Sequence, residues 1–261
     1  VVKNVAGYDL CKLFTGSYGT LCLILELTFK LRPLPGQTTT IAAQGSIEAL
    51  LRSARAILDA RLLPVAVELL SSGVAQKLAI SHEDEDASLL IRYAGTPETV
   101  VYQTEQTVTL LRGEQAHVQV ATLNEDAEYW RGLAALPMEP TKALSWRAAL
   151  LPTELEMFLN RAMKEGGAAF SSSSLWHAGV ADGRLRVMNT TNDNAVACAT
   201  ALKRLRAETR GTLVIENAPQ EIKDSIDAWG DFGSKTSLMR RVKQELDPNG
   251  LFSPGRFFGE S

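Results

Sequence analysis

Short strand-like and helix-like segments alternate along most of this chain, and this alternation is the feature that most constrains its fold. Apolar residues recur with a period of two in some segments and at helical spacing in others, with turn-forming residues between them. We expect strands over residues 38–43, 65–70, 88–94, 116–121, 143–150, 170–180, 184–189 and 212–216. We expect helices over residues 46–61, 74–80, 96–112, 124–135, 152–164, 192–210 and 235–246.

This order of segments predicts an α+β domain in which helices cover an antiparallel sheet. The dipeptide Asp182-Gly183 is a hairpin signal and predicts that residues 170–180 pair with residues 184–189. The segments also fall into two similar sets, although no sequence repeat relates them. We therefore expect one domain made of two similar halves.

The first 35 residues have a different character. Glycines punctuate a short helical pattern at residues 9–14, and residues 20–31 alternate like a long strand. Pro33-Leu34-Pro35-Gly36 then breaks the pattern. We predict domain boundaries that give residues 1–35, 36–246 and a tail of 247–261, and we expect that the chain begins inside a domain.

Composition excludes several classes of function. The 27 Lys and Arg against 30 Asp and Glu give a formal charge of -3, which provides no basic footprint for nucleic acid. No apolar run reaches the length that spans a membrane. Cys11, Cys22 and Cys198 are an odd number at wide spacing, which is typical of a reducing compartment and argues against a disulfide scaffold. We expect a cytoplasmic location.

The glycine-rich segment near the start is the most informative candidate site. Gly7, Gly16 and Gly19 permit positive φ angles, and successive exposed N–H groups can form a nest for an anion such as a pyrophosphate. The spacing is not that of a dinucleotide-binding fingerprint, and no Gly-Lys-Ser/Thr closes it as in a P-loop. Composition alone leaves a purely structural turn as the more common alternative.

Two motifs at opposite ends of the chain resemble one known family. The string Lys3-Asn4-Val5-Ala6-Gly7-Tyr8-Asp9-Leu10, followed by Gly16-Ser17-x-Gly19-Thr20-Leu21, resembles the second half of the PCMH-type FAD-binding domain of the vanillyl-alcohol-oxidase superfamily. The ending Asp247-Pro248-x-Gly250-x-Phe252-x-Pro254-Gly255-Arg256-Phe257 is similar to the C-terminal signature of the same flavoproteins. Within that superfamily, the chain is most similar to the FAD-binding subunits of bacterial glycolate oxidases.

The resemblance implies a fold, a cofactor and a reaction. The chain would contain the C-terminal part of a PCMH-type FAD-binding domain followed by an α+β cap domain, but not the first half of the FAD domain. It would hold FAD and oxidise glycolate, or a similar 2-hydroxy acid, to the 2-oxo acid. The alternative is a non-catalytic assembly subunit that keeps the flavoprotein fold.

The resemblance also implies partners. The sequence has no cysteine cluster for an iron–sulfur centre, so electrons would pass to another chain. The family implies a complex with a second flavin subunit and an iron–sulfur subunit. The complex would be either free in the cytoplasm or peripheral at the inner membrane through those partners.

The resemblance assigns cofactor-binding roles to thirteen residues and no catalytic or metal-binding role. Cys22 and Ser253 depart from the family pattern, which usually has glycine and asparagine there. The implied FAD contacts are Asn4, Gly7, Tyr8, Asp9, Gly16, Ser17, Gly19, Thr20, Leu21, Ile24, Pro254, Gly255 and Arg256.

Other polar residues are weaker candidates. His177 lies on a predicted strand of the cap domain, where a lone histidine is more often structural than catalytic. Arg92, Arg147 and Arg186 also lie on predicted strands and can bind a carboxylate substrate. His82 adjoins an acidic run, for which a solvated loop is the simpler explanation.

Overall fold

The computed structural model describes residues 9–80, 86–114, 119–123, 126–136, 144–189 and 194–256. The chain divides into two compact units. The terminal unit comprises residues 1–32 and 229–261, and the sheet unit comprises residues 33–228. The predicted boundaries differ from these units mainly in the helix at residues 235–246, which belongs with the two chain ends because Lys243 in it binds the carbonyl of Thr20.

The sheet unit contains one eight-stranded sheet in which all described pairs are antiparallel. Its strands, in chain order, are β1 Gln37–Gly45, β2 Ala66–Ser71, β3 Ala87–Gly95, β4 Gln119–Leu123, β5 Leu144–Ala149, β6 Leu175–Gly179, β7 Arg184–Asn189 and β8 Thr212–Asn217. The spatial order is β4-β1-β3-β2-β6-β7-β5-β8. In each consecutive set of four strands, the first lies between the third and the fourth, so the two predicted halves share one topology and join where β2 pairs with β6.

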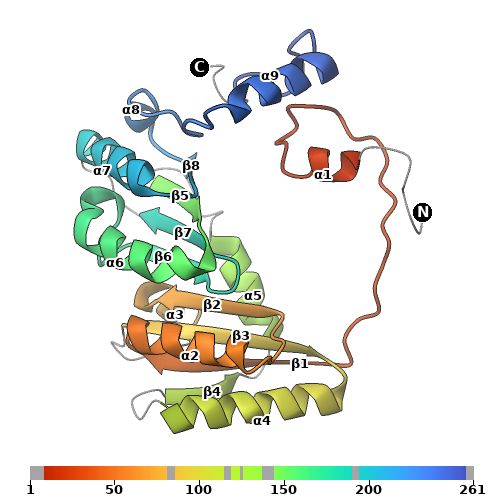
Figure 1. The fold of residues 1–261 in the computed structure, drawn as a ribbon, viewed down its shortest axis with the longest axis vertical. Coiled ribbons are helices and arrows are strands. Elements are labelled where there is room, and N and C mark those ends of the chain that lie inside the picture. The colour runs from red at the N-terminus through yellow and green to blue at the C-terminus, as the bar shows by residue number, and fades with distance from the viewer. Residues whose placement is uncertain are drawn as a thin grey trace. The chain divides into compact units, whose positions relative to one another are not determined.

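Helices cover the sheet on both faces (Figure 1). They are α2 Ile47–Asp59, α3 Ser72–Lys77, α4 Pro97–Glu114, α5 Asp126–Ala135, α6 Leu155–Glu165, α7 Ala195–Glu208 and the short α8 Gln220–Lys223. The main core joins one sheet face to α2, α4, α6 and α7, and includes the fully buried Leu69, Leu89 and Trp146. Because side chains alternate along a strand, Leu70 and Leu90 face the other way, in a smaller cluster with α3 and α5.

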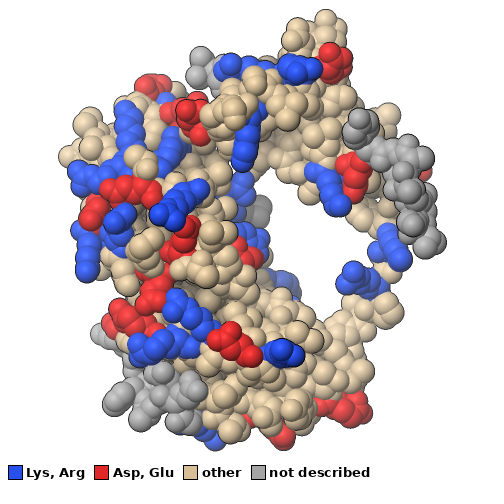
Figure 2. Space-filling model, in the orientation of Figure 1, with Lys and Arg blue, Asp and Glu red and all other residues tan. Residues whose placement is uncertain are grey.

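The second face of the sheet is polar over the strands of the second half. Charged side chains on β5, β7 and β8 occupy it, whereas α3 and α5 cover the apolar part. Figure 2 shows Lys and Arg interspersed with Asp and Glu over the viewed surface of the sheet unit, and not gathered into one basic patch. Among the described helices, none has the length and apolar character needed to cross a membrane.

Most predicted segments of the sheet unit are confirmed, and the largest shift concerns the strand expected over residues 170–180. It begins only at Leu175, because Ser171 and Ser174 close a turn just before it. The Ser174 N–H donates to the Ser171 carbonyl, and the Ser171 N–H donates to the Ser174 hydroxyl oxygen. The predicted hairpin between β6 and β7 is confirmed, with Gly183 at φ 70° and its N–H donating to the Gly179 carbonyl over 2.9 Å.

The described residues of the terminal unit form two helices, α1 Leu10–Phe14 and α9 Lys235–Leu246. The strand predicted over residues 20–31 is wrong, since residues 22–35 are described and form neither helix nor strand. They make no backbone hydrogen bond to another described residue, and a strand requires a partner for those groups. The alternating Leu23, Leu25, Leu27, Phe29 and Leu31 are therefore 59–89% exposed.

Candidate functional site

The glycine turn, residues 15–21, follows directly on α1. Asp9 caps that helix by accepting a hydrogen bond from the Lys12 N–H, and Gly16 and Gly19 then adopt φ angles of 80° and 70°. A Thr20 N–H···O=C Ser17 bond of 3.0 Å closes the turn. In the described part of the chain, the N–H groups of Gly16 and Gly19 donate to no other residue. These two donors are available to an anion.

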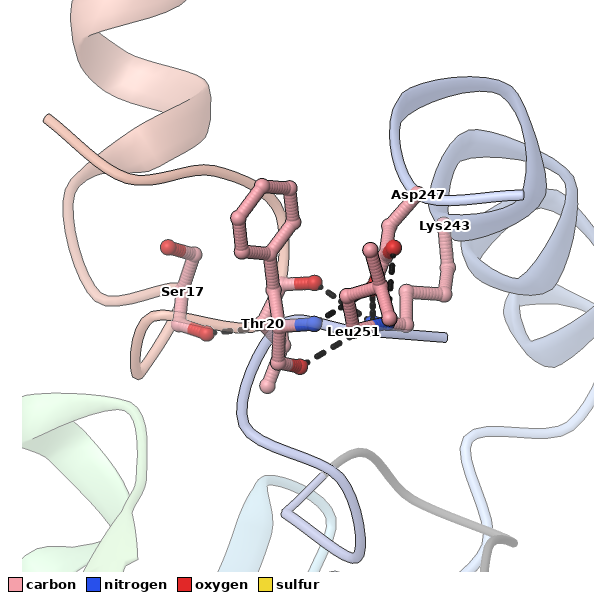
Figure 3. Close-up of polar contacts among 6 residues, drawn as sticks. Ser17, Thr20, Lys243, Asp247 and Leu251 are labelled. Carbon is pink, nitrogen blue, oxygen red and sulfur yellow. Dashed lines mark hydrogen bonds and ion pairs between the residues drawn. The ribbon is translucent and has the colours of Figure 1, made fainter. Parts of the chain in front are cut away.

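A buried ion pair fastens the glycine turn to the end of α9. Lys243 Nζ donates to the Thr20 carbonyl at 2.8 Å, to Asp247 Oδ2 at 2.5 Å and to the Phe252 carbonyl at 3.2 Å. Figure 3 shows Lys243 and Asp247 meeting beside the turn that carries Ser17 and Thr20. The two motifs that the sequence placed at opposite ends of the chain therefore come together within the terminal unit.

Asp247 is held as a carboxylate by three hydrogen bonds, one from each of Lys243, Leu251 and Phe252. Burial on its own raises the pKa of this carboxyl, but the bonds from Lys243 and from the N–H groups of Phe252 and Leu251 outweigh it and lower the pKa from 3.8 to about 2. These backbone bonds, both 2.9 Å, also fix the start of the tail.

The depressed pKa of Asp247 predicts a specific acid sensitivity. A carboxyl whose folded pKa lies below its unfolded value stabilises the folded state above pH 3.8, and this contribution disappears as the pH falls toward about 2. Asp247→Asn should therefore flatten the loss of stability of the terminal unit in that window, as measured by denaturant unfolding at a series of pH values. Glu245→Gln, an exposed position on the same helix, should leave the pH dependence unchanged.

A cavity of about 330 Å³ lies beside the glycine turn, within the terminal unit. Apolar side chains dominate its lining, and Arg256 contributes a cationic group. Trp229 lies edge-on to Tyr18 at 5.1 Å between ring centroids, and its indole N–H donates to the Arg256 carbonyl. The volume is at the lower end of the range of small-molecule sites. The apolar walls suit a planar ring, and the turn donors and Arg256 suit a phosphate, so these residues fit part of an FAD molecule.

The predicted FAD contacts have different places in the structure. Gly16, Ser17, Thr20, Leu21 and Arg256 line the cavity, and Gly19 packs against Ser253, whose hydroxyl oxygen lies 3.1 Å from where a Cβ on Gly19 would be. Four other predicted residues do not line the cavity: Asp9 caps α1, Ile24 is 49% exposed on the segment that forms neither helix nor strand, and Pro254 and Gly255 are exposed. Asn4, Gly7, Tyr8 and His82 lie outside the described residues.

A second cavity, of about 310 Å³, lies on the polar face of the sheet unit. Three arginines line it, Arg147 on β5 and Arg184 and Arg186 on β7. Arg147 and Arg186 are directly paired across β5 and β7, and both approach Glu216 Oε1, at 3.7 Å from Arg147 Nε and 2.8 Å from Arg186 Nη2. The strand register thus gathers guanidinium groups at one place.

His177 and Glu68 complete the second cavity. His177 Nδ1 lies 3.0 Å from Glu68 Oε2, and both side chains are mostly buried. Arg184 pairs with Asp182 at the hairpin, and the hydrogen bond between them raises the pKa of the Arg184 guanidinium. The sequence prediction included Arg147, Arg186 and His177 but missed Glu68 and Glu216, since their role depends on strand pairing.

Arg92, the third arginine considered from the sequence, belongs elsewhere. Its guanidinium lies over the ring of Trp130, 5.6 Å from the centroid. Trp130 in turn donates its indole N–H to the Thr40 hydroxyl. Arg92 therefore supports the packing of α5 on the sheet and does not line the second cavity.

The chain belongs to the family of FAD linked oxidases, because residues 35–163 and 232–257 match the model of that family's C-terminal domain. The matched ranges include the first half of the sheet unit and most of the C-terminal segment of the terminal unit. This match confirms the predicted family, the α+β class and the predicted cofactor, FAD.

Curated relatives carry names that concern glycolate oxidation. The chain is 29% identical to glycolate oxidase subunit GlcD of Bacillus subtilis (strain 168), with 100% of this chain and 59% of that protein covered. It is 27% identical to glycolate oxidase subunit GlcE of Escherichia coli (strain K12), with 100% and 60% covered. The chain thus spans about three-fifths of the length of these relatives.

Solved structures share the fold at low sequence identity. An alkyldihydroxyacetonephosphate synthase superposes with a TM-score of 0.63 at 11% identity, covering 98% of this chain and 51% of that one. A p-cresol methylhydroxylase crystallised with substrate bound gives a TM-score of 0.60 at 16% identity, covering 87% and 54%. These likenesses concern the fold alone.

Proposed function

We propose that the chain is the C-terminal part of an FAD-dependent oxidoreductase that acts on glycolate or a similar 2-hydroxy acid. Membership in the FAD linked oxidase family supports the flavin, and the names of two relatives suggest the acid. The observation that carries the substrate class is the cavity lined by Arg147, Arg184 and Arg186, because guanidinium groups are the preferred partners of carboxylates.

The residues of each unit have distinct tasks under this proposal. In the terminal unit, the N–H groups of Gly16 and Gly19 and the side chain of Arg256 bind the phosphates of the cofactor. In the sheet unit, the three arginines bind the carboxylate of the acid. Bound FAD supplies the two-electron acceptor that the oxidation of an alcohol to a carbonyl requires.

Flavin binding and flavin reduction test the proposal. The whole protein, of which this chain would be the C-terminal part, should retain flavin absorbance when it is mixed with FAD and passed through a gel-filtration column. Gly19→Val should reduce the amount retained, because its side chain enters the turn and meets Ser253. Anaerobic addition of glycolate to the retained complex should bleach the flavin band. A folded protein that emerges colourless, or a flavin band that glycolate leaves unchanged, would contradict the proposal.

One observation favours the second candidate, an assembly subunit of the same kind of complex. Residues 22–35 expose a row of large apolar side chains and make no backbone hydrogen bond to another described residue. Such a segment can add to the edge of a sheet in a partner. The proposed partners are a second flavin subunit and an iron–sulfur subunit, and the names of the two relatives, each called a subunit, support a complex of several chains. Assembly without flavin reduction would favour this role.

A further inference from the structure

Lys243 is a buried cation whose hydrogens are all used within the terminal unit. The residue is 7% exposed. An ammonium group has three hydrogens, and Lys243 Nζ donates to Asp247 Oδ2 and to the carbonyl groups of Thr20 and Phe252 (Figure 3). Lys243 also does not line the cavity beside the glycine turn. Any effect of Lys243 on that cavity is therefore exerted through the groups that it holds.

Lys243 fixes the direction of the peptide group between Thr20 and Leu21. This peptide bond is trans, so its carbonyl and its N–H point in opposite directions. The carbonyl points to Lys243, and the Leu21 N–H therefore points away from it. Among the described residues, the Leu21 N–H has no acceptor, although Leu21 is only 7% exposed. Because Leu21 lines the cavity and buried N–H groups are almost always paired, the geometry indicates an acceptor that a ligand supplies there.

The same ammonium group holds the start of the tail that carries Arg256. Lys243 Nζ donates to the Phe252 carbonyl at 3.2 Å, and the Arg256 N–H donates to the carbonyl of the next residue, Ser253, at 3.2 Å. Arg256 lines the cavity. Lys243 thus fixes both the turn that offers N–H donors and the tail that offers a guanidinium group.

We propose that Lys243 is a positioning residue for a diphosphate anion. It directs the Leu21 N–H toward the anion, in addition to the free N–H groups of Gly16 and Gly19, and it fixes the tail that carries Arg256. Several N–H groups in one turn form a nest for an anion, and their alignment determines how tightly it binds. The inference rests on the proposed function for the identity of the anion, the pyrophosphate of FAD, and adds the residue that sets the geometry of its site.

A charge-neutral double substitution separates positioning from electrostatic attraction. Lys243→Met with Asp247→Asn removes one positive and one negative charge, so it leaves no unpaired buried charge, but the Thr20 carbonyl loses its donor. Isothermal titration of the whole protein with inorganic pyrophosphate should give about tenfold weaker binding for this variant. Lys235→Met with Glu245→Gln, at two exposed positions of the same helix, is the matched control and should not change the affinity.

Asp247→Asn alone distinguishes the ion pair from the bond to the turn. Lys243 keeps its bond to the Thr20 carbonyl in this variant, so the protein should lose stability but bind pyrophosphate at least as tightly as the wild type. The same loss of affinity in Asp247→Asn as in the double variant would overturn the inference, because the bond between Lys243 and Thr20 would then not be what matters.

A measurement on the wild-type protein serves if the double variant fails to fold. Pyrophosphate should shift the amide proton of Leu21 downfield in ¹H–¹⁵N correlation spectra, together with those of Gly16 and Gly19, because each gains an anionic acceptor. A Leu21 amide proton that does not shift while pyrophosphate binds, or an absence of pyrophosphate binding, would contradict the positioning role.

The outcomes also distinguish this inference from the proposed function. Pyrophosphate binding that depends on Lys243, in a whole protein that retains no FAD, would support the positioning role and contradict the flavoprotein. Retention of FAD that glycolate bleaches, together with equal pyrophosphate affinities of the wild type and the double variant, would support the oxidoreductase and contradict the role of Lys243.

Discussion

Replacing Lys243 with methionine should lower the free energy of unfolding of the terminal unit by about 3 kcal/mol. Methionine has a similar length but cannot donate. The change therefore removes the partner of the buried Asp247 and leaves the carbonyl groups of Thr20 and Phe252 without the donor they now share. Since one of these carbonyls belongs to the glycine turn, the turn should lose its fixed position as well.

The measurement should follow the terminal unit separately from the sheet unit. Of the four tryptophans, Trp229 lies in the terminal unit and the other three in the sheet unit. Urea unfolding followed by ¹⁹F NMR of 5-fluorotryptophan, with the Trp229 signal assigned by Trp229→Phe, reports the two units independently. Lys235→Met on the same helix is the control, because Lys235 is exposed. Equal effects of the two substitutions would contradict a stabilising role for the buried hydrogen bonds of Lys243 to Thr20, Asp247 and Phe252.

Local patterns were sufficient to predict most elements of the sheet unit and helix α9 of the terminal unit. Helix α9 was predicted with its observed bounds, because Pro248 and Gly250 stop the helical pattern just beyond Leu246. The hairpin at Asp182-Gly183 was predicted from the same kind of signal, since only a few backbone conformations reverse a chain in so few residues.

Contacts between distant residues could not be predicted in this way. The Lys243–Thr20 bond joins positions 223 residues apart, and the His177–Glu68 bond joins positions 109 residues apart. Lys243 and Asp247 are four residues apart at a helix end, a spacing that permits an ion pair. The spacing does not reveal that Lys243 also donates to the carbonyl groups of Thr20 and Phe252.

The failed strand at residues 20–31 has a related explanation. Alternation shows that a segment can present one apolar face, but a strand forms only when another segment accepts its hydrogen bonds. The described chain offers no such edge to Leu23–Leu31, so the pattern of a strand remains as an exposed, irregular segment. The exposed apolar side chains and unpaired backbone groups of this segment would both be satisfied by pairing with another strand, and the described residues do not supply one.

Gly183→Ala should lower the free energy of unfolding of the sheet unit by about 3 kcal/mol or more. A Cβ on Gly183 would lie 2.2 Å from the Leu150 carbonyl oxygen, and the backbone there has little room to move. The Leu150 N–H donates to the Gly183 carbonyl at 3.0 Å, and the Gly183 N–H donates to the Gly179 carbonyl at 2.9 Å. Its φ of 70° adds strain for any residue with a side chain.

Gly167→Ala separates the steric clash from the strain of a positive φ angle. Gly167 has a φ of 47°, but a Cβ there meets no atom within 4 Å, so alanine should cost only about 1 kcal/mol. Urea unfolding followed by the sheet-unit tryptophan signals measures both variants. Similar losses of stability in both variants would show that the contact with Leu150 is not what requires glycine at position 183.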